Sequence, residues 1–357
     1  MDVRITAYAR LLVERSIDVQ PGWQVLVQSY PPAPELVDEI QRWIARRGAY
    51  ALVRYNTTFP PEVPWTQEAP EELVGTLAPL EAQVFEGIDA WIHVHAPENL
   101  KAEADLTEAR STLAAKARAP FTNRRISFSM PWVGCEFPVP ALAQEAGMSL
   151  RSFEDFLYGA CLIDWDAEGE RMQRIADRFD RAEEVRIVAA ETDLRLSLAG
   201  RIGMVDDGHF NMPGGEVFYS PVEDSAEGVI TFGEFPAVSG GRFVEGARFL
   251  YKAGLVVEAS ARAEEDFLLS RLASDEGARR LGELGIGCNP GITRHMRNTR
   301  FDEKIDGTIH LALGAGLPFI GGKNVSSVHW DMVKDLRPGG RLYCDGELVQ
   351  ESGVWKI

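Results

Sequence analysis

The sequence predicts an α/β N-terminal domain followed by an α+β, β-rich C-terminal domain. At 357 residues the chain exceeds the length at which one hydrophobic core usually stops growing. Its first half alternates short apolar runs with segments of helical spacing. From about Val185 onward, short alternating runs punctuated by glycine are typical of antiparallel strands. We therefore expect domains at 1–182 and 183–357.

The N-terminal half contains four runs that we expect to be strands, and they cover 24–28, 51–55, 90–94 and 125–128. Apolar residues at helical spacing predict helices over 34–47, 70–85, 106–117 and 138–146. Strand–helix–strand alternation indicates a mostly parallel sheet with helices on both faces. The first strand is not followed by G-x-G-x-x-G, so the sequence does not support a dinucleotide site.

The junction and the second half follow a different pattern. Helices are predicted over 150–158 and 167–179, and a further helix over 263–285. The expected strands of this half include 185–188, 193–198, 228–232 and 254–259. The second half is therefore predicted to be built mainly from antiparallel strands.

Composition restricts the partners of this protein. Hydrophobic residues make up 45% of the chain and charged residues 25%, as in ordinary globular proteins. A net charge of −17 argues against binding nucleic acid or an anionic membrane surface. The first residues lack a basic-then-apolar leader, and no apolar stretch reaches about 18 residues. We expect a cytoplasmic protein with neither a membrane nor a nucleic-acid partner.

His329 and Asp331 form the most informative short motif. Residues two apart in an extended segment point to the same side, so this imidazole and this carboxylate can converge. Such a pair suits a divalent cation such as Zn²⁺, Co²⁺, Mn²⁺ or Fe²⁺. The sequence therefore predicts a metal site near the C-terminus.

Three further residues are candidate ligands. Glu216 follows a Pro-Gly-Gly turn, Glu283 lies in a glycine-rich stretch, and His310 begins an expected strand after a charged loop. Each position alone is more often a solvated acid or a hydrogen-bonded core histidine than a ligand. Together, three carboxylates and two imidazoles suit either a dinuclear site or one metal ion with a catalytic acid or base.

Four segments in the second half, taken together, resemble the aminopeptidase T and aminopeptidase S family of metallo-aminopeptidases. They are Asn211-Met212-Pro213-Gly214-Gly215-Glu216-Val217-Phe218, Glu283-Leu284-Gly285-Ile286-Gly287 with Asn289-Pro290, Gly307-Thr308-Ile309-His310, and His329-Trp330-Asp331. The segments occur in the family's order. The N-terminal half is similar to the family's first domain, though less specifically.

The resemblance implies a dinuclear site for Zn²⁺, Co²⁺ or Mn²⁺ that is bound by Glu216, Glu283, His310, His329 and Asp331. It implies an aminopeptidase that releases N-terminal residues from small peptides through a metal-bridged hydroxide. It also implies a homodimer. Glu283 is the candidate bridging ligand or proton shuttle and hence the candidate catalytic residue.

One position departs from the family pattern. Leu317 stands where better-known members carry a catalytic tyrosine. A phenolic hydroxyl there would stabilise the oxyanion, and removing one such donor costs about 10²–10³-fold in rate. Tyr219 and Lys323 are candidate replacements. A carboxylate is also needed for the substrate's ammonium group, and Glu303 or Asp306 could supply it.

Two alternatives stay open. The dihydroxypyridine dioxygenases resemble this chain and keep the His-x-Asp pair, so the first alternative is a mononuclear Fe²⁺ ring-cleaving enzyme. They carry histidine in place of Glu283 and lack Glu216 and His310, so hydrolysis is favoured. Leu317 also raises the possibility of a non-catalytic protein that has inherited a metal site.

Overall fold

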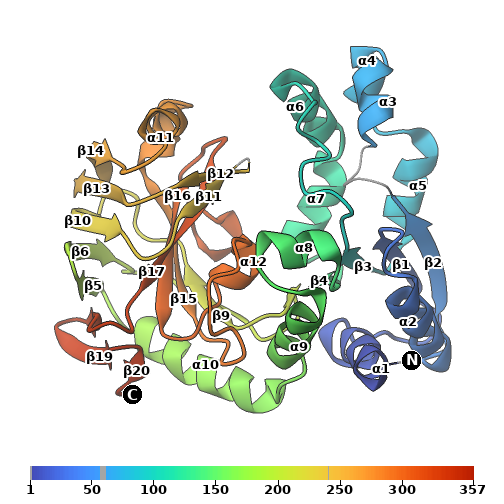
Figure 1. The fold of residues 1–357 in the computed structure, drawn as a ribbon, viewed down its shortest axis with the longest axis horizontal. Helices are drawn as coiled ribbons and strands as arrows, with labels where there is room; N and C mark the ends of the chain where they lie inside the picture. The colour runs from blue at the N-terminus through green and yellow to red at the C-terminus, as the bar shows by residue number, and fades with distance from the viewer. Residues whose placement is uncertain (1, 57–61, 240) are drawn as a thin grey trace. The chain divides into compact units, whose positions relative to one another are not determined.

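The computed structural model describes residues 2–56, 62–239 and 241–357 (Figure 1). The chain divides into two compact units. One unit comprises Met1–Leu162 with Gly208–Pro213, and the other comprises Ile163–Asp207 with Gly214–Ile357. The domain boundary at residues 182 and 183 stays a prediction. The predicted fold class is confirmed, because a parallel sheet with helices lies in the first unit and antiparallel sheets lie in the second.

The first unit is built on a parallel sheet with strand order β2-β1-β3-β4-β8. Its strands are β1 (Gln24–Ser29), β2 (Tyr50–Tyr55), β3 (Ala90–His95), β4 (Trp132–Glu136) and β8 (Asn211–Met212). Strands β1 and β3 are almost wholly buried, as parallel strands covered on both faces are expected to be. The last strand, β8, is the short segment through which the chain returns to this unit.

The helices of the first unit lie between these strands. They are α1 (Val3–Arg10) with a π-helical continuation (Leu11–Ser16), α2 (Pro34–Arg46), α3 (Val63–Glu68), α4 (Glu71–Val74), α5 (Pro79–Gly87), α6 (Glu108–Ala117), α7 (Ala119–Ile126), α8 (Pro140–Glu145) and α9 (Leu150–Cys161). None of the helices in the described ranges is both long and apolar enough to cross a membrane.

The strand predicted at 125–128 is wrong. These residues end helix α7, and the fourth parallel strand is β4. Phe121 on α7 is buried against Phe85 and Trp91, so tertiary packing favours the helix over the short apolar run. A single alternating pair of apolar residues is too short a signal to oppose that packing.

The second unit contains an antiparallel sheet with strand order β14-β13-β10-β6-β5-β18-β19-β20. Its strands are β5 (Glu184–Ala189), β6 (Thr192–Ser197), β10 (Glu227–Phe232), β13 (Ala247–Lys252), β14 (Leu255–Ser260), β18 (Arg341–Cys344), β19 (Glu347–Glu351) and β20 (Val354–Trp355). The hairpin β11 (Ala237–Ser239) and β12 (Arg242–Val244) is separate. Helix α10 (Trp165–Phe179) also belongs to this unit and contacts strands of the other antiparallel sheet, described next.

That sheet has strand order β17-β16-β15-β9-β7, and β15, β16 and β17 run side by side in Figure 1. Its strands are β7 (Met204–Asp206), β9 (Glu216–Tyr219), β15 (Leu281–Gly287), β16 (Thr308–Gly314) and β17 (His329–Asp335). Short helices complete the unit, namely α11 (Glu265–Leu272), α12 (Thr299–Asp302) and the 3₁₀ turns Glu276–Arg279 and Pro318–Ile320.

The helix predicted over 263–285 is wrong in its second half. Helix α11 ends at Leu272, and Leu281–Gly287 form the fully buried central strand β15. Glycines at alternate positions of β15 make close contacts with neighbouring strands, which favours a strand here. Glu283 therefore lies on a rigid strand and not in a turn.

Gly285 shows how tightly this sheet is packed. It lies directly opposite His310 in the register of β15 and β16. A Cβ atom at Gly285 would lie 1.8 Å from His310 Cε1, which no side chain tolerates. The absence of a side chain at Gly285 is therefore what lets the His310 ring lie across β15.

We predict that Gly285→Ala lowers the free energy of unfolding by about 1–3 kcal/mol, because the new methyl group overpacks the sheet and displaces His310. Denaturant unfolding measures this change. Gly233→Ala is the matched control, since nothing lies within 4 Å of a Cβ built there. Equal stability of both variants would contradict the prediction.

Candidate metal centre

The five residues proposed as ligands come together on one face of the five-stranded sheet of the second unit. Strand β9 begins with Glu216, β15 carries Glu283, β16 carries His310, and β17 carries His329 and Asp331. In antiparallel strands, residues paired in register point to the same face of the sheet. The register therefore directs all five side chains to one side.

Each of these residues lies opposite a glycine or an alanine. Glu216 pairs with Gly287 and His310 with Gly285. Ala312 pairs with Glu283 on one side and with Asp331 on the other, and Gly314 pairs with His329. Small side chains between the large polar ones leave room for the polar groups to face one another.

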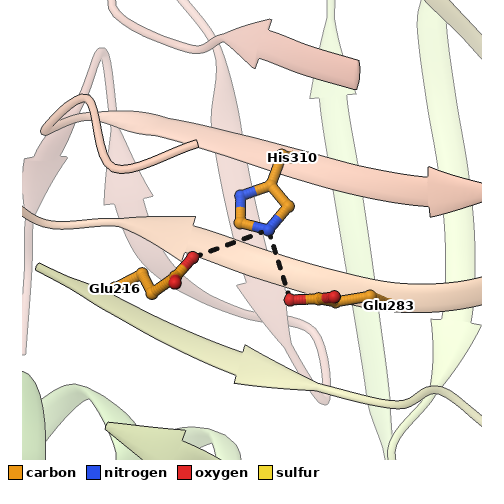
Figure 2. Close-up of side chains that lie close together, drawn as sticks. All are labelled: Glu216, Glu283 and His310. Carbon is orange, nitrogen blue, oxygen red and sulfur yellow. Dashed lines mark hydrogen bonds and ion pairs between the residues drawn. The ribbon is translucent and has the colours of Figure 1, made fainter. Parts of the chain in front are cut away.

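The first group of side chains is shown in Figure 2, where Glu216 and Glu283 both point toward His310. His310 Nε2 lies 3.4 Å from Glu283 Oε1 and 3.7 Å from Glu216 Oε2. The three side chains are almost completely buried. One nitrogen and two oxygens thus converge from three different strands.

The second group lies beside the first and shares Glu283 with it. His329 Nε2 lies 3.2 Å from Glu283 Oε2 and 3.6 Å from Asp331 Oδ1. The two oxygens of Glu283 therefore face two different imidazoles. Both groups have ligand atoms within 4.8 Å of one another, close enough to hold a metal ion.

Backbone carbonyls orient both imidazole rings. His310 Nδ1 donates to the carbonyl oxygen of Glu303 at 3.0 Å, and His329 Nδ1 donates to that of Ala315 at 3.0 Å. These hydrogen bonds place the proton on Nδ1 and leave each Nε2 directed at the carboxylates. Metal-binding histidines are typically held in this way by their second nitrogen.

The pKa values reflect the close contact of acids and imidazoles. Burial alone would lower the pKa of His310 and of His329, but contact with Glu283 and the neighbouring acids raises each to about 10. Burial would raise the pKa of Glu283, yet the two imidazoles lower it to about 2. Burial is the main influence on Glu216 and Asp331 and raises their pKa to about 8 and about 6. Protons thus occupy positions that a cation would take.

Sequence reasoning named Glu303 only as a possible partner of the substrate's ammonium group, and it did not identify Lys304. Glu303 forms a third possible ligand group with His310 and Asp331. Lys304 Nζ lies 3.1 Å from Glu216 Oε1 and also donates to Glu303 Oε1. The signal was the charged run that begins at Asp302, which we interpreted only as a loop.

The residues present fit a divalent cation. Glu216 Oε2 is buried and has no hydrogen-bond partner among the described residues, although it faces His310. A buried carboxylate oxygen without a donor is costly unless a cation or a water molecule satisfies it. Imidazole nitrogens and carboxylate oxygens without thiolates suit Zn²⁺, Co²⁺ or Mn²⁺.

The structure also bears on the residues considered in place of the family tyrosine. The hydroxyl of Tyr219 is engaged elsewhere, since it lies 2.9 Å from Asp180 Oδ1 and donates to the carbonyl oxygen of Ala176. Lys323 is exposed, and its backbone N–H donates to Glu223. Leu317 N donates to Ser220 Oγ at 2.8 Å, which fixes the start of a 3₁₀ turn. Tyr219 is thus not the replacement donor.

Comparison with known proteins identifies the family of this chain. Residues 1–354 match the family described as thermophilic metalloprotease (M29). Aminopeptidase 2 of Geobacillus stearothermophilus is 28% identical over 87% of this chain and 83% of its own length. Aminopeptidase AmpS of Bacillus subtilis is 26% identical over 90% of this chain and 87% of its own length.

Two solved structures share the fold. Wild-type AmpT from Thermus thermophilus superposes with a TM-score of 0.85 at 24% identity and covers 99% of both chains. The 2,5-dihydroxypyridine dioxygenase of Pseudomonas putida KT2440 superposes with a TM-score of 0.64 at 14% identity, over 99% of this chain and 97% of its own. The match to the family extends over nearly the whole sequence, and this chain belongs to the M29 family of thermophilic metalloproteases.

Proposed function

We propose that this protein is a metal-dependent aminopeptidase with a dinuclear site bound by Glu216, Glu283, His310, His329 and Asp331. The observation that carries the proposal is the position of Glu283, whose two oxygens face two different imidazoles. A carboxylate shared in this way suits a bridge between two cations. Membership of a metalloprotease family and relatives named aminopeptidases support the reaction.

Peptide hydrolysis needs an activated water molecule, a polarised carbonyl and a proton donor for the leaving amine. Two bound divalent cations would supply the first two, since they polarise carbonyl oxygens and lower the pKa of water. Glu283 belongs to two ligand groups, one of which contains Glu216 and the other Asp331. The backbone carbonyls behind the imidazoles keep both Nε2 atoms aimed inward.

Glu303 is the better of the two carboxylates considered for the substrate's ammonium group. It is half-buried beside His310 and Asp331. Glu303 also pairs with Lys304, but that pair lies within the cluster, whereas Asp306 belongs to none of the ligand groups among the described residues and pairs with Arg171 at 3.3 Å. A carboxylate at a fixed distance from the cluster would select substrates with a free N-terminus, which is the requirement for an exopeptidase.

The mononuclear dioxygenase is the weaker alternative. The resemblance assigns Glu216 and His310 to the peptidase pattern, and here both side chains face Glu283 in one group. The likeness to the dioxygenase structure concerns the fold alone, and a fold does not determine chemistry. We further propose Zn²⁺, Co²⁺ or Mn²⁺ as the ions, small peptides as substrates, and a cytoplasmic homodimer as the working form.

Purified protein loaded with Zn²⁺, Co²⁺ or Mn²⁺ is expected to cleave aminoacyl chromogenic amides and dipeptides. Glu283→Gln is expected to lower kcat by at least about 10²-fold, because it removes the shared carboxylate charge. Circular dichroism checks that the variant is folded. Glu347→Gln is the matched control, since Glu347 is an exposed partner of Arg178. Unchanged cleavage by Glu283→Gln would remove Glu283 from the mechanism.

Metal binding is expected to release protons near pH 7. In the metal-free protein, His310 and His329 carry raised pKa values of about 10, so both are protonated at this pH. Metal ligands must be deprotonated, and apparent affinity should therefore rise with pH from about 6 to about 9. Titration calorimetry with Zn²⁺ in buffers of different ionisation enthalpy counts the protons. Affinity independent of pH would contradict the expectation.

Tyr219→Phe is expected to lower the free energy of unfolding by about 1–3 kcal/mol, because Asp180 loses a buried hydrogen-bond partner. Its kcat should stay within about twofold of the wild-type value, since the hydroxyl is engaged at helix α10. Denaturant unfolding and peptide hydrolysis measure the two effects. A large loss of kcat with full stability would instead make Tyr219 the replacement for the family tyrosine.

A further inference from the structure

Lys304 is a buried cation in contact with the proposed ligand set. Its side chain has no exposed surface, and its Nζ lies 3.1 Å from Glu216 Oε1 while donating to Glu303 Oε1. The backbone around it is fixed, because Lys304 N donates to the Phe301 carbonyl and Lys304 O accepts from Asn289 N at 2.9 Å. The ammonium group is therefore held in one place.

The contacts of Lys304 lie on one side of the cluster. Glu216 and Glu303 belong to the two ligand groups that contain His310. The remaining group is built from Glu283, His329 and Asp331, and the ion pairs of Lys304 within the described residues do not include any of these three. The groups overlap through Glu283 and Asp331, but the buried positive charge lies against Glu216 and Glu303, the acids that the group containing His329 lacks.

The charge of Lys304 is maintained by its surroundings. Its ammonium lies against the carboxylates of Glu216 and Glu303, and a buried ammonium paired with two carboxylates keeps its positive charge. The ammonium also occupies Glu216 Oε1. The other oxygen, Oε2, is the one that faces His310 and has no hydrogen-bond partner among the described residues.

We propose that Lys304 is a positioning residue that makes the two metal positions unequal. Its ammonium occupies one oxygen of Glu216 and repels a cation at the Glu216–His310 position. The position formed by Glu283, His329 and Asp331 therefore fills first and more tightly. This inference rests on the dinuclear site proposed above and concerns the relative affinity of its two positions.

Two effects of Lys304 oppose each other, and their sizes decide the sign. Ordering the Glu216 side chain helps an ion to bind by about tenfold. The ammonium repels a divalent ion at either position, but at an effective dielectric constant of about 20 an ion about 4 Å away is weakened on the order of 10³-fold more than one about 8 Å away. Repulsion prevails, so removal of the charge should strengthen the weaker position.

Titration calorimetry with Zn²⁺, together with metal analysis by mass spectrometry, tests the inference. Wild-type protein should bind two ions in steps that differ at least tenfold in affinity. Lys304→Met should reduce the ratio of the two Zn²⁺ affinities at least tenfold. Lys304→Arg should leave this ratio unchanged because it keeps the positive charge. Lys334→Met is the matched control, since Lys334 is equally buried but binds Thr231 O and Glu234.

A second pair of variants tests the order of filling without changing Lys304. His329→Ala should remove the tighter step, and His310→Ala should remove the weaker one. The reverse assignment, or steps that do not respond to Lys304→Met, would overturn the inference while leaving a dinuclear site in place. One ion bound by the wild type and by every Lys304 variant would overturn both the inference and the dinuclear site. Two unequal steps without peptide cleavage would overturn only the proposed function.

Discussion

The pairing register of the antiparallel sheet β17-β16-β15-β9-β7 is the constraint on which the proposed site depends. Strands in register place paired side chains about 4.5–5.5 Å apart on one face, so a small partner on one neighbouring strand leaves room for a large polar group. Gly285, Gly287 and Gly314 are such small partners, and Ala312 is paired with two acids, one on each neighbouring strand. A shift by one residue would turn every ligand on the shifted strand to the opposite face.

The second constraint on the proposed site is the close packing of charged side chains. Three acids, two imidazoles, Glu303 and Lys304 are packed into one largely buried cluster that is open to solvent at His329, and an unpaired charge in its buried part would be costly. Contact with the neighbouring acids raises the pKa of His310 and of His329, and contact with the two imidazoles lowers the pKa of Glu283. The cost of holding like charges together in the metal-free protein is what makes the cluster receptive to divalent ions.

The same fold occurs in a protein named as a peptidase and in one named as a dioxygenase, so the fold does not decide the chemistry. The side chains on the metal-binding face make that decision. Leu317 stands where the resemblance leads us to expect the family tyrosine. Lys304 adds a fixed charge beside the ligands, so the local electrostatics of this site are asymmetric.

The sequence by itself determined the class of fold and the five candidate ligands, because spacing in strands and glycine-rich motifs are local properties. It failed at 125–128 and at 263–285, where packing of Phe121 and the close contacts of Gly285 and Gly287 outweighed local patterns. Only the tertiary structure brought Glu303 and Lys304 to the cluster and showed that Glu283 faces both imidazoles. The contacts of Glu283 join strands far apart in the chain, and strand register, which no short sequence pattern encodes, decides which side chains meet.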